Sequence, residues 1–299
     1  MTALLGTVFV SDSEGQLFQR VKKGEILQWA HVNKPGSKVV AGGSVSSSES
    51  SIVFCTTAGS AIERVLSSKS WLAHGHPKGS QLAAVVDARV LKDSVFFVGS
   101  NGRLYELTGQ QWQDHNSPGS RLAALPGTPL KDTNSGVGSL FLVAQDGRLV
   151  ERWFNRQSAW EWISHGLPPG AKVASPPAAS KGTVFLVGDT GELFERFWDG
   201  KWQWRAHGSP PNTDGCAHVR PVLVSSHSVF CSLVDGRLSE RVLKSNRWSW
   251  VIHAVPEGSS EGSPAQYCSA NPLSPYNCIK GHEAIVGPGP PLTDRLDEL

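Results

Sequence analysis

The sequence predicts an all-β protein, a six-bladed β-propeller built from four-stranded antiparallel blades. Three observations indicate this fold: a turn glycine recurs about every 44 residues, each copy shows the same order of strand-like segments, and helical periodicity is absent. The glycines are Gly15, Gly59, Gly102, Gly147, Gly191 and Gly236, in steps of 44, 43, 45, 44 and 45 residues.

The first two strands of each copy flank the glycine. An apolar run such as VFLV at 184–187 precedes it, and a segment such as GELFER at 191–196 follows it. Apolar runs joined by a short glycine-containing turn are typical of a β-hairpin.

Two more strands are expected in each copy. A tryptophan with a nearby histidine marks a third strand, in the pairs Trp29/His31, Trp71/His74, Trp112/His115, Trp162/His165, Trp204/His207 and Trp250/His253. Small-residue segments mark a fourth strand, with examples at 81–88, 121–127 and 172–179. Since small residues suit a crowded position near an axis, we expect this strand to be innermost.

The repeats predict one propeller domain over residues 1–270, followed by a Pro/Gly-rich tail at 271–299. The expected repeats span about 6–50, 51–93, 94–136, 137–182, 183–227 and 228–259. No small-residue segment precedes the TVFV run at 7–10, so the chain is expected to open on the second strand of a blade. A closing strand at about 260–270 would then supply the inner strand beside residues 6–31 and protect the sheet edges.

Composition excludes several classes of function. The formal net charge of +2 is too small to indicate a surface that binds nucleic acid. No run approaches 18 apolar residues, so no membrane span is expected. No signal peptide is recognisable, which favours a cytoplasmic location, or a secretory or ER one if the N-terminus is processed. The five cysteines form no CxxC pair, which argues against a metal site and favours reduced thiols, although Cys268 and Cys278 would close a short loop in an oxidising environment. No cofactor is expected.

Polar residues recur in the same frame. A glutamate stands four residues after five of the glycines (Glu63, Glu106, Glu151, Glu195 and Glu240), with Gln19 in the first copy. A hydroxyl stands eight residues before every glycine, at Thr7, Ser51, Ser94, Ser139, Thr183 and Ser228.

Two interpretations of this frame stay open. In the structural one, the carboxylate accepts a hydrogen bond from the imidazole or the indole and links neighbouring strands. In the functional one, carboxylates and aromatic rings lie in the cleft between adjacent blades and bind a sugar. The candidate ligand-binding residues are then Glu151, Glu195, Glu240, Glu63, Glu106, Trp162, Trp204, Trp250, Trp198 and Arg196.

Segments such as TVFLVGDTGELFERFWDGKW at 183–202, and the Trp-x-x-His-Gly-x-Pro ends around Trp162 and Trp204, resemble the repeats of the fucose-specific lectins of fungi and bacteria. The resemblance covers the chain to about residue 270 and implies sugar sites between blades. It assigns sugar contacts to the five glutamates and to an aromatic platform. The family's arginine, eight residues before the turn glycine, is replaced by Ser or Thr in every copy.

The sequence therefore favours a non-enzymatic, lectin-like propeller that binds a glycan or a glycoprotein. The alternative is a protein-protein interaction scaffold that binds no sugar. A glycosidase or sialidase is less favoured, because catalysis needs unique residues in particular blades, whereas the carboxylates here are repeated. No catalytic residue is proposed.

Overall fold

The computed structural model describes residues 2–4, 7–11, 14–23, 26–32, 38–39, 46–47, 51–86, 94–131, 138–155, 159–180, 182–225 and 227–253. These residues form six four-stranded antiparallel sheets. Within these ranges there is no helix, and hence none that is long and apolar enough to cross a membrane. The predicted six-bladed propeller of four-stranded sheets is confirmed.

The sheets are numbered 1 to 6 along the chain, and each takes four consecutive strands. Sheet 1 contains β1 (Thr2–Leu4), β2 (Thr7–Ser11), β3 (Leu17–Lys23) and β4 (Ile26–His31). Sheet 2 contains β5 (Ser46–Ser47), β6 (Ser51–Cys55), β7 (Ala61–Val65) and β8 (Trp71–Gly75). Sheet 3 contains β9 (Leu82–Val86), β10 (Ser94–Gly99), β11 (Leu104–Thr108) and β12 (Gln111–Asp114).

The second half of the chain repeats this arrangement. Sheet 4 contains β13 (Thr128–Lys131), β14 (Gly138–Val143), β15 (Leu149–Phe154) and β16 (Trp160–Gly166). Sheet 5 contains β17 (Ala178–Ser180), β18 (Thr183–Val187), β19 (Leu193–Trp198) and β20 (Trp202–Gly208). Sheet 6 contains β21 (Val222–Ser225), β22 (Ser228–Ser232), β23 (Leu238–Lys244) and β24 (Arg247–His253).

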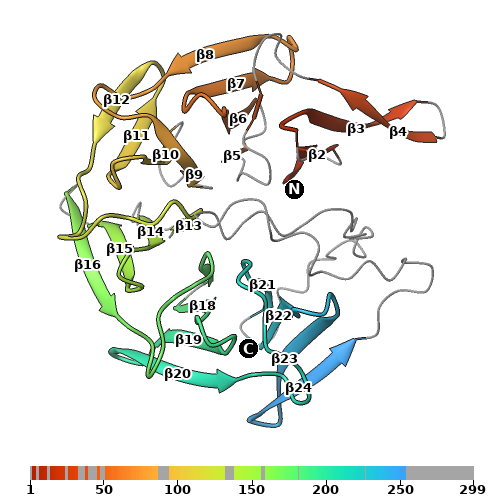
Figure 1. Ribbon diagram of the computed structural model, residues 1–299, viewed down its shortest axis with the longest axis vertical. Coiled ribbons are helices and arrows are strands. Elements are labelled where there is room, and N and C mark those ends of the chain that lie inside the picture. The colour runs from red at the N-terminus through yellow and green to blue at the C-terminus, as the bar shows by residue number, and fades with distance from the viewer. Residues whose placement is uncertain are drawn as a thin grey trace, which may run out of the picture.

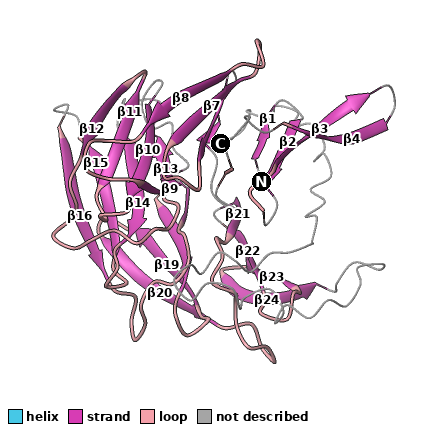
Figure 2. Ribbon diagram, turned by 45° about the horizontal axis from the view of Figure 1, so that its top comes forward, coloured by secondary structure: helices cyan, strands magenta, loops and turns pink. Residues whose placement is uncertain are grey.

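The sheets follow one another around an axis, with the first strand of each near the centre and the fourth on the outside (Figure 1). Figure 2 shows the same sheets tilted, with loops and turns joining the strand ends. This arrangement places one face of each sheet against the next sheet along the chain.

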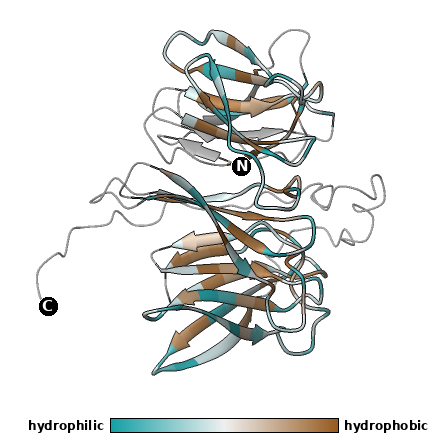
Figure 3. Ribbon diagram, turned by 90° about the vertical axis from the view of Figure 1, so that its left-hand side faces the viewer, coloured by the Kyte–Doolittle hydropathy of each residue, from teal (hydrophilic) through white to brown (hydrophobic). Residues whose placement is uncertain are grey.

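The hydrophobic core lies between the sheets. Phe141 and Leu149 of sheet 4, for example, share a buried cluster with Val184 and Leu186 of sheet 5. Four further clusters join the other consecutive pairs, from sheets 1 and 2 to sheets 5 and 6. Figure 3 shows hydrophobic segments, in brown, along many of the strands.

The recurring turn glycine has two physical reasons, both visible at Gly147. Its φ of +87° lies in the left-handed region, and an added Cβ would come within 2.5 Å of the Cβ of Lys172. The approach is close because the amide of Val173 donates to the carbonyl of Gly147 at 2.9 Å. The glycine is therefore also the point where the chain leading to the next sheet lies against the turn.

The structure corrects the expected inner strand of the first sheet. The strand beside β2 is β1, in which Thr2 pairs with Phe9 and Leu4 with Thr7. The N-terminal residues occupy the position that we expected the segment at about 260–270 to fill. A three-residue strand is too short to show the alternation by which strands are recognised. The segment 260–270 and the tail at 271–299 lie outside the described residues.

Two small-residue segments are also placed differently from the prediction. The segment at 81–88 does contain the inner strand β9, but the segment at 121–127 precedes β13, and most of the segment at 172–179 precedes β17. Leu122 and Val173 form only isolated bridges. Both amides donate to the carbonyl of a turn glycine, so these segments cross the preceding hairpin turn before the inner strand begins.

The expectation of reduced thiols is wrong for one pair of cysteines. Cys216 and Cys231 form a disulfide, with their Cα atoms 5.8 Å apart. They lie on neighbouring segments of sheet 6, where Cys216 forms an isolated bridge with Leu233. They are 15 residues apart in the sequence, and the pairing of these two segments brings them together. Cys55 is a buried free thiol, and burial raises its pKa to about 12.

Candidate functional site

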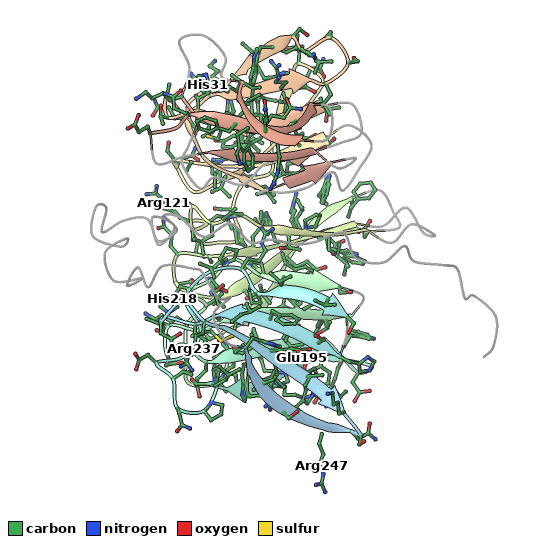
Figure 4. All side chains as sticks on the ribbon, turned by 90° about the vertical axis from the view of Figure 1, so that its right-hand side faces the viewer. His31, Arg121, Glu195, His218, Arg237 and Arg247 are labelled. Carbon is green, nitrogen blue, oxygen red and sulfur yellow. A yellow bond between two sulfur atoms is a disulfide. The ribbon has the colours of Figure 1, made fainter. Side chains whose placement is uncertain are left out.

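Glu195 is the centre of a hydrogen-bonded network in sheet 5. The hydroxyl of Thr183 donates to its Oε1 at 2.9 Å, and Nε2 of His207 lies 3.0 Å from its Oε2. Arg205 places Nη1 2.9 Å from the same oxygen. Glu195 is buried, and Figure 4 shows it inside the stack of strands. One carboxylate thus links three neighbouring strands, β18, β19 and β20.

The ionisation of this network follows from its burial. Burial alone would raise the pKa of Glu195, but the hydrogen bonds from His207 and Thr183, together with the electrostatic effect of Arg205 and His207, hold the pKa below its usual value. Burial lowers the pKa of His207, against the opposing effect of Glu195. The neutral imidazole therefore donates its Nε2–H to a charged carboxylate, which leaves Nδ1 as an acceptor.

The same network recurs in the other sheets that carry the glutamate. The hydrogen-bonded pairs are Glu63 with His74 at 2.8 Å, Glu106 with His115 at 2.8 Å and Glu151 with His165 at 3.0 Å. In sheet 6, Nε2 of His253 lies 3.4 Å from Glu240 but forms no hydrogen bond to a described residue. Hydroxyls complete it: Ser139 donates to Glu151, Ser228 donates to Glu240 at 2.7 Å, and Thr108 donates to Glu106 at 3.4 Å. We call this arrangement the Glu–His network.

The tryptophans of the frame act between sheets. The indole Nε1–H of Trp204 donates to the backbone carbonyl of His165 in the preceding sheet at 3.0 Å. Trp162 donates in the same way to His115, and Trp112 to His74, each at 3.1 Å. One version of the structural interpretation expected these indoles to donate to the carboxylates. Instead, each of the three links its own sheet to the previous one.

An arginine follows four of the five glutamates and lies at the same boundaries. The guanidinium of Arg196 lies 5.2 Å from the centre of the Trp204 ring, a cation-π contact. Arg241 contacts Trp250 at 5.1 Å, and its Nε lies 3.4 Å from Nδ1 of His207 in the preceding sheet. Arg241 therefore faces Nδ1 of His207, the imidazole nitrogen that does not contact Glu195.

The third copy departs from this pattern with a visible consequence. Leu107 stands where the other copies have the arginine, and Nδ1 of His74, in the preceding sheet, is buried with no hydrogen-bond partner among the described residues. The comparable nitrogen of His115 lies 3.4 Å from Arg152.

A second set of tryptophans, which sequence reasoning did not assign to the frame, packs on the histidines. Trp160, Trp202 and Trp248 each meet the ring of the preceding sheet's histidine edge to face, at 5.2, 4.9 and 4.7 Å between ring centres. Each stands two residues before the tryptophan of its frame. That spacing is the signal that identifies them.

These contacts confirm the structural interpretation of the recurring frame. The five predicted glutamates all lie within a Glu–His network, and Trp162 and Trp204 donate across sheet boundaries. Trp250 and Arg196 take part in cation-π pairs. A ligand-binding role for these residues stays a prediction.

Trp198 is the predicted residue that the network does not use. It is 56% exposed, the largest exposed fraction of any tryptophan in the described ranges. It lies at the end of the β19–β20 hairpin, where it pairs with Trp202, and the two rings meet edge to face at 5.7 Å.

Sheet 4, which faces this side of sheet 5, contributes further side chains near the end of the β19–β20 hairpin. Trp153 lies two residues beyond Glu151 on β15 and pairs with Glu161 on β16, so all three share one face of sheet 4. That face meets sheet 5, because Trp202 packs on His165, the partner of Glu151. We call Trp153, Glu161, Trp198 and Trp202 the hairpin-end cluster of sheets 4 and 5.

Comparisons with known proteins agree on the fold alone. No family model and no curated protein matches the chain. Solved structures do match. One is BBS1N in complex with ARL6DN, at a TM-score of 0.58 and 12% identity, covering 84% of this chain and 76% of that one. Another is YCF48 bound to D1 peptide, at 0.51 and 17%, covering 77% and 73%.

A third match is an arginine-to-alanine mutant of AofleA from Arthrobotrys oligospora, at a TM-score of 0.52 and 14% identity, covering 83% of each chain. The chain is a β-propeller. At these identities the likeness extends to the fold and no further, so the resemblance to fucose-specific lectins is not established as membership. In the described ranges, no group of three or more His, Cys, Asp or Glu residues could hold a metal ion.

Proposed function

We propose that this propeller is a non-enzymatic glycan-binding protein, with a sugar site at the hairpin-end cluster of sheets 4 and 5. The observation that carries the proposal is the exposure of Trp198, which contacts Trp202 on the side of sheet 5 that faces the Trp153–Glu161 pair of sheet 4. Because more than half of the Trp198 side chain is in water, its ring is accessible to a ligand that stacks on it.

The chemistry of the cluster matches that of a pyranose. The axial C–H groups of a sugar stack on an indole face, while its hydroxyls need hydrogen-bond partners in fixed positions. Trp198 offers the exposed ring, and the exposed carboxylate of Glu161 lies on the facing sheet. The side chain of Asn155 donates to Glu161, which orients that carboxylate.

The test is a titration of the full chain with a panel of monosaccharides and short glycans, followed by tryptophan fluorescence and calorimetry. Trp198→Ala is expected to weaken binding about tenfold, because losing one stacked ring costs on the order of 1.4 kcal/mol. Trp29→Ala is the matched control, since Trp29 is also exposed but lies on sheet 1. Equal loss in both variants, or no saturable sugar binding, would contradict the proposal.

A protein-interaction scaffold is the second candidate, and the Glu–His network favours it. The repeated carboxylates already accept hydrogen bonds from their own sheets, which leaves fewer groups for sugar hydroxyls. Two of the matched propellers are described in complex with a protein or a peptide. A specific protein partner captured by the wild type and by Trp198→Ala alike, with no response to glycans, would support this candidate.

A further inference from the structure

Among the described residues, nothing packs on the outward face of sheet 6 as the next sheet packs on the same face of sheets 1 to 5. Leu238 of β23 is 39% exposed, whereas Leu193, at the same position in sheet 5, is 0% exposed. The corresponding residues Leu149, Leu104 and Leu17 are also buried. The leucine at this position of the repeat is thus exposed in sheet 6 and buried in sheets 1, 3, 4 and 5, although its place in the repeat is the same.

Several other groups on this face show the same difference. Phe230 pairs with Val222 and with Glu240, which places all three on the face of Leu238. Phe230 is half-buried and Val222 is exposed, whereas Phe185, the counterpart of Phe230 in sheet 5, is fully buried.

The Glu–His network of sheet 6 is open on this side too. The side chain of His253 is 40% exposed, against 1% for His207. His207 is covered by Trp248 and faces Arg241, both from the next sheet. No described residue covers His253 in this way, and no hydrophobic cluster among the described residues joins sheet 6 to sheet 1. In Figure 1 no labelled strand lies between β24 and β4.

The sequence after the described residues contains a copy of the hairpin pattern. Residues 286–295 read VGPGPPLTDR, and residues 187–196 of sheet 5 read VGDTGELFER. Val, Gly, Leu and Arg stand at identical offsets, and Asp294 stands where Glu195 stands. Pro290 replaces the turn glycine, so the turn itself differs.

We propose that residues 284–296 dock on the outward face of sheet 6 and supply the hairpin that every other sheet receives from its successor. The 46 residues from 254 to 299 exceed one repeat step of 43 to 45 residues, so the chain after sheet 6 is long enough to reach this face. Ile285 and Thr293 stand where Leu186 and Phe194 stand in sheet 5, and those two residues pack on the preceding sheet. They would face Leu238 and Phe230, and Arg295, two residues beyond Thr293 and hence on the same face, would face His253 as Arg241 faces His207. This inference is independent of the sugar site, because it concerns a different sheet.

The test measures the alkylation rate of a cysteine placed on this face of the full chain. Leu238→Cys is reacted with iodoacetamide, and modification of that peptide alone is followed by mass spectrometry. We expect slow reaction, accelerated at least about tenfold by the added pair Ile285→Asp and Thr293→Asp, because burial protects the thiol. Leu273→Asp, in the same stretch but outside the repeated pattern, is the matched control and should leave the rate unchanged.

Each other outcome overturns the proposal. Fast alkylation of Leu238→Cys without further change means that nothing covers the face. Slow alkylation that the paired aspartates do not accelerate, or that Leu273→Asp accelerates equally, means that another segment covers it. Protection that rises with protein concentration means that a second copy covers it. If Leu238→Cys does not fold by circular dichroism, Val222→Cys on the same face takes its place.

Discussion

At the scale of single residues, a glutamate occurs at the same position in five sheets because its hydrogen-bond donors occur there too. Glu195 accepts hydrogen bonds from Thr183 on one side and from His207 on the other, and Glu151 does the same with Ser139 and His165. A buried carboxylate without such donors would be strongly unfavourable. The hydroxyl, the carboxylate and the imidazole therefore have to recur together, which explains why the frame is so regular.

The network predicts that stability falls on acidification. The pKa values of Glu106 and Glu195 are lowered, so their stabilising contribution is present above about 4.5 and is lost as the pH falls through the lower folded values. The pKa of His207 is also lowered, so the folded state favours the neutral ring, and protonation destabilises it below about 6.5. Both effects have the same sign.

Urea unfolding at pH values from 7.5 to 4 measures this effect. We expect the free energy of unfolding to begin to fall below about pH 6.5 and to fall more steeply below about 4.5. Stability that stays constant or rises over this interval would contradict the assignment of a neutral His207 to a charged Glu195.

At the scale of elements, the hairpin turn decides how one sheet is joined to the next. Gly147 combines a left-handed φ with a contact that leaves no room for a Cβ, while Gly166, at the end of β16, has a φ of +74° and open space around it. A substitution at Gly166 therefore meets only backbone strain, whereas one at Gly147 meets both backbone strain and a steric clash.

The pair gives a matched prediction. Gly166→Ala should cost about 1 kcal/mol of unfolding free energy, because only the left-handed conformation opposes it. Gly147→Ala should cost about 2 kcal/mol more, because Lys172 and its backbone must also move. Thermal and urea unfolding of the two variants check this order, and equal losses would show that the approach of Lys172 is not constraining.

At the scale of the whole molecule, stability resides between sheets rather than within them. Phe141 of sheet 4 is fully buried in a cluster that includes Val184, Leu186 and Phe194 of sheet 5. Neither sheet covers this cluster alone, so consecutive sheets should stabilise each other as in other repeat proteins.

Phe141→Ala should therefore lower the free energy of unfolding by about 3–5 kcal/mol. Hydrogen exchange should accelerate in sheet 5 as well as in sheet 4, because the cavity opens between them. Phe197→Ala, at a half-buried position next to Arg205, is the control with a smaller expected effect. Exchange that accelerates in sheet 4 alone would mean that the sheets are independent.

The sequence by itself determined the number of sheets, the position of each hairpin and the recurring polar frame. It could do so because these features depend on local spacing: the turn needs a glycine, and a carboxylate on one strand needs donors at fixed offsets on its neighbours. Even the five glutamates and their histidine partners were identifiable from the repeat.

Only the tertiary structure decided what those side chains do across sheet boundaries. The carbonyl that Trp204 reaches belongs to His165 of another sheet, Cys216 meets Cys231 through strand pairing, and β1 fills the inner position expected for a distant segment. The exposure of Trp198 and Leu238 likewise depends on which sheet lies opposite. Such contacts join residues far apart in the chain, so they follow from how whole sheets pack and not from the local pattern of either partner.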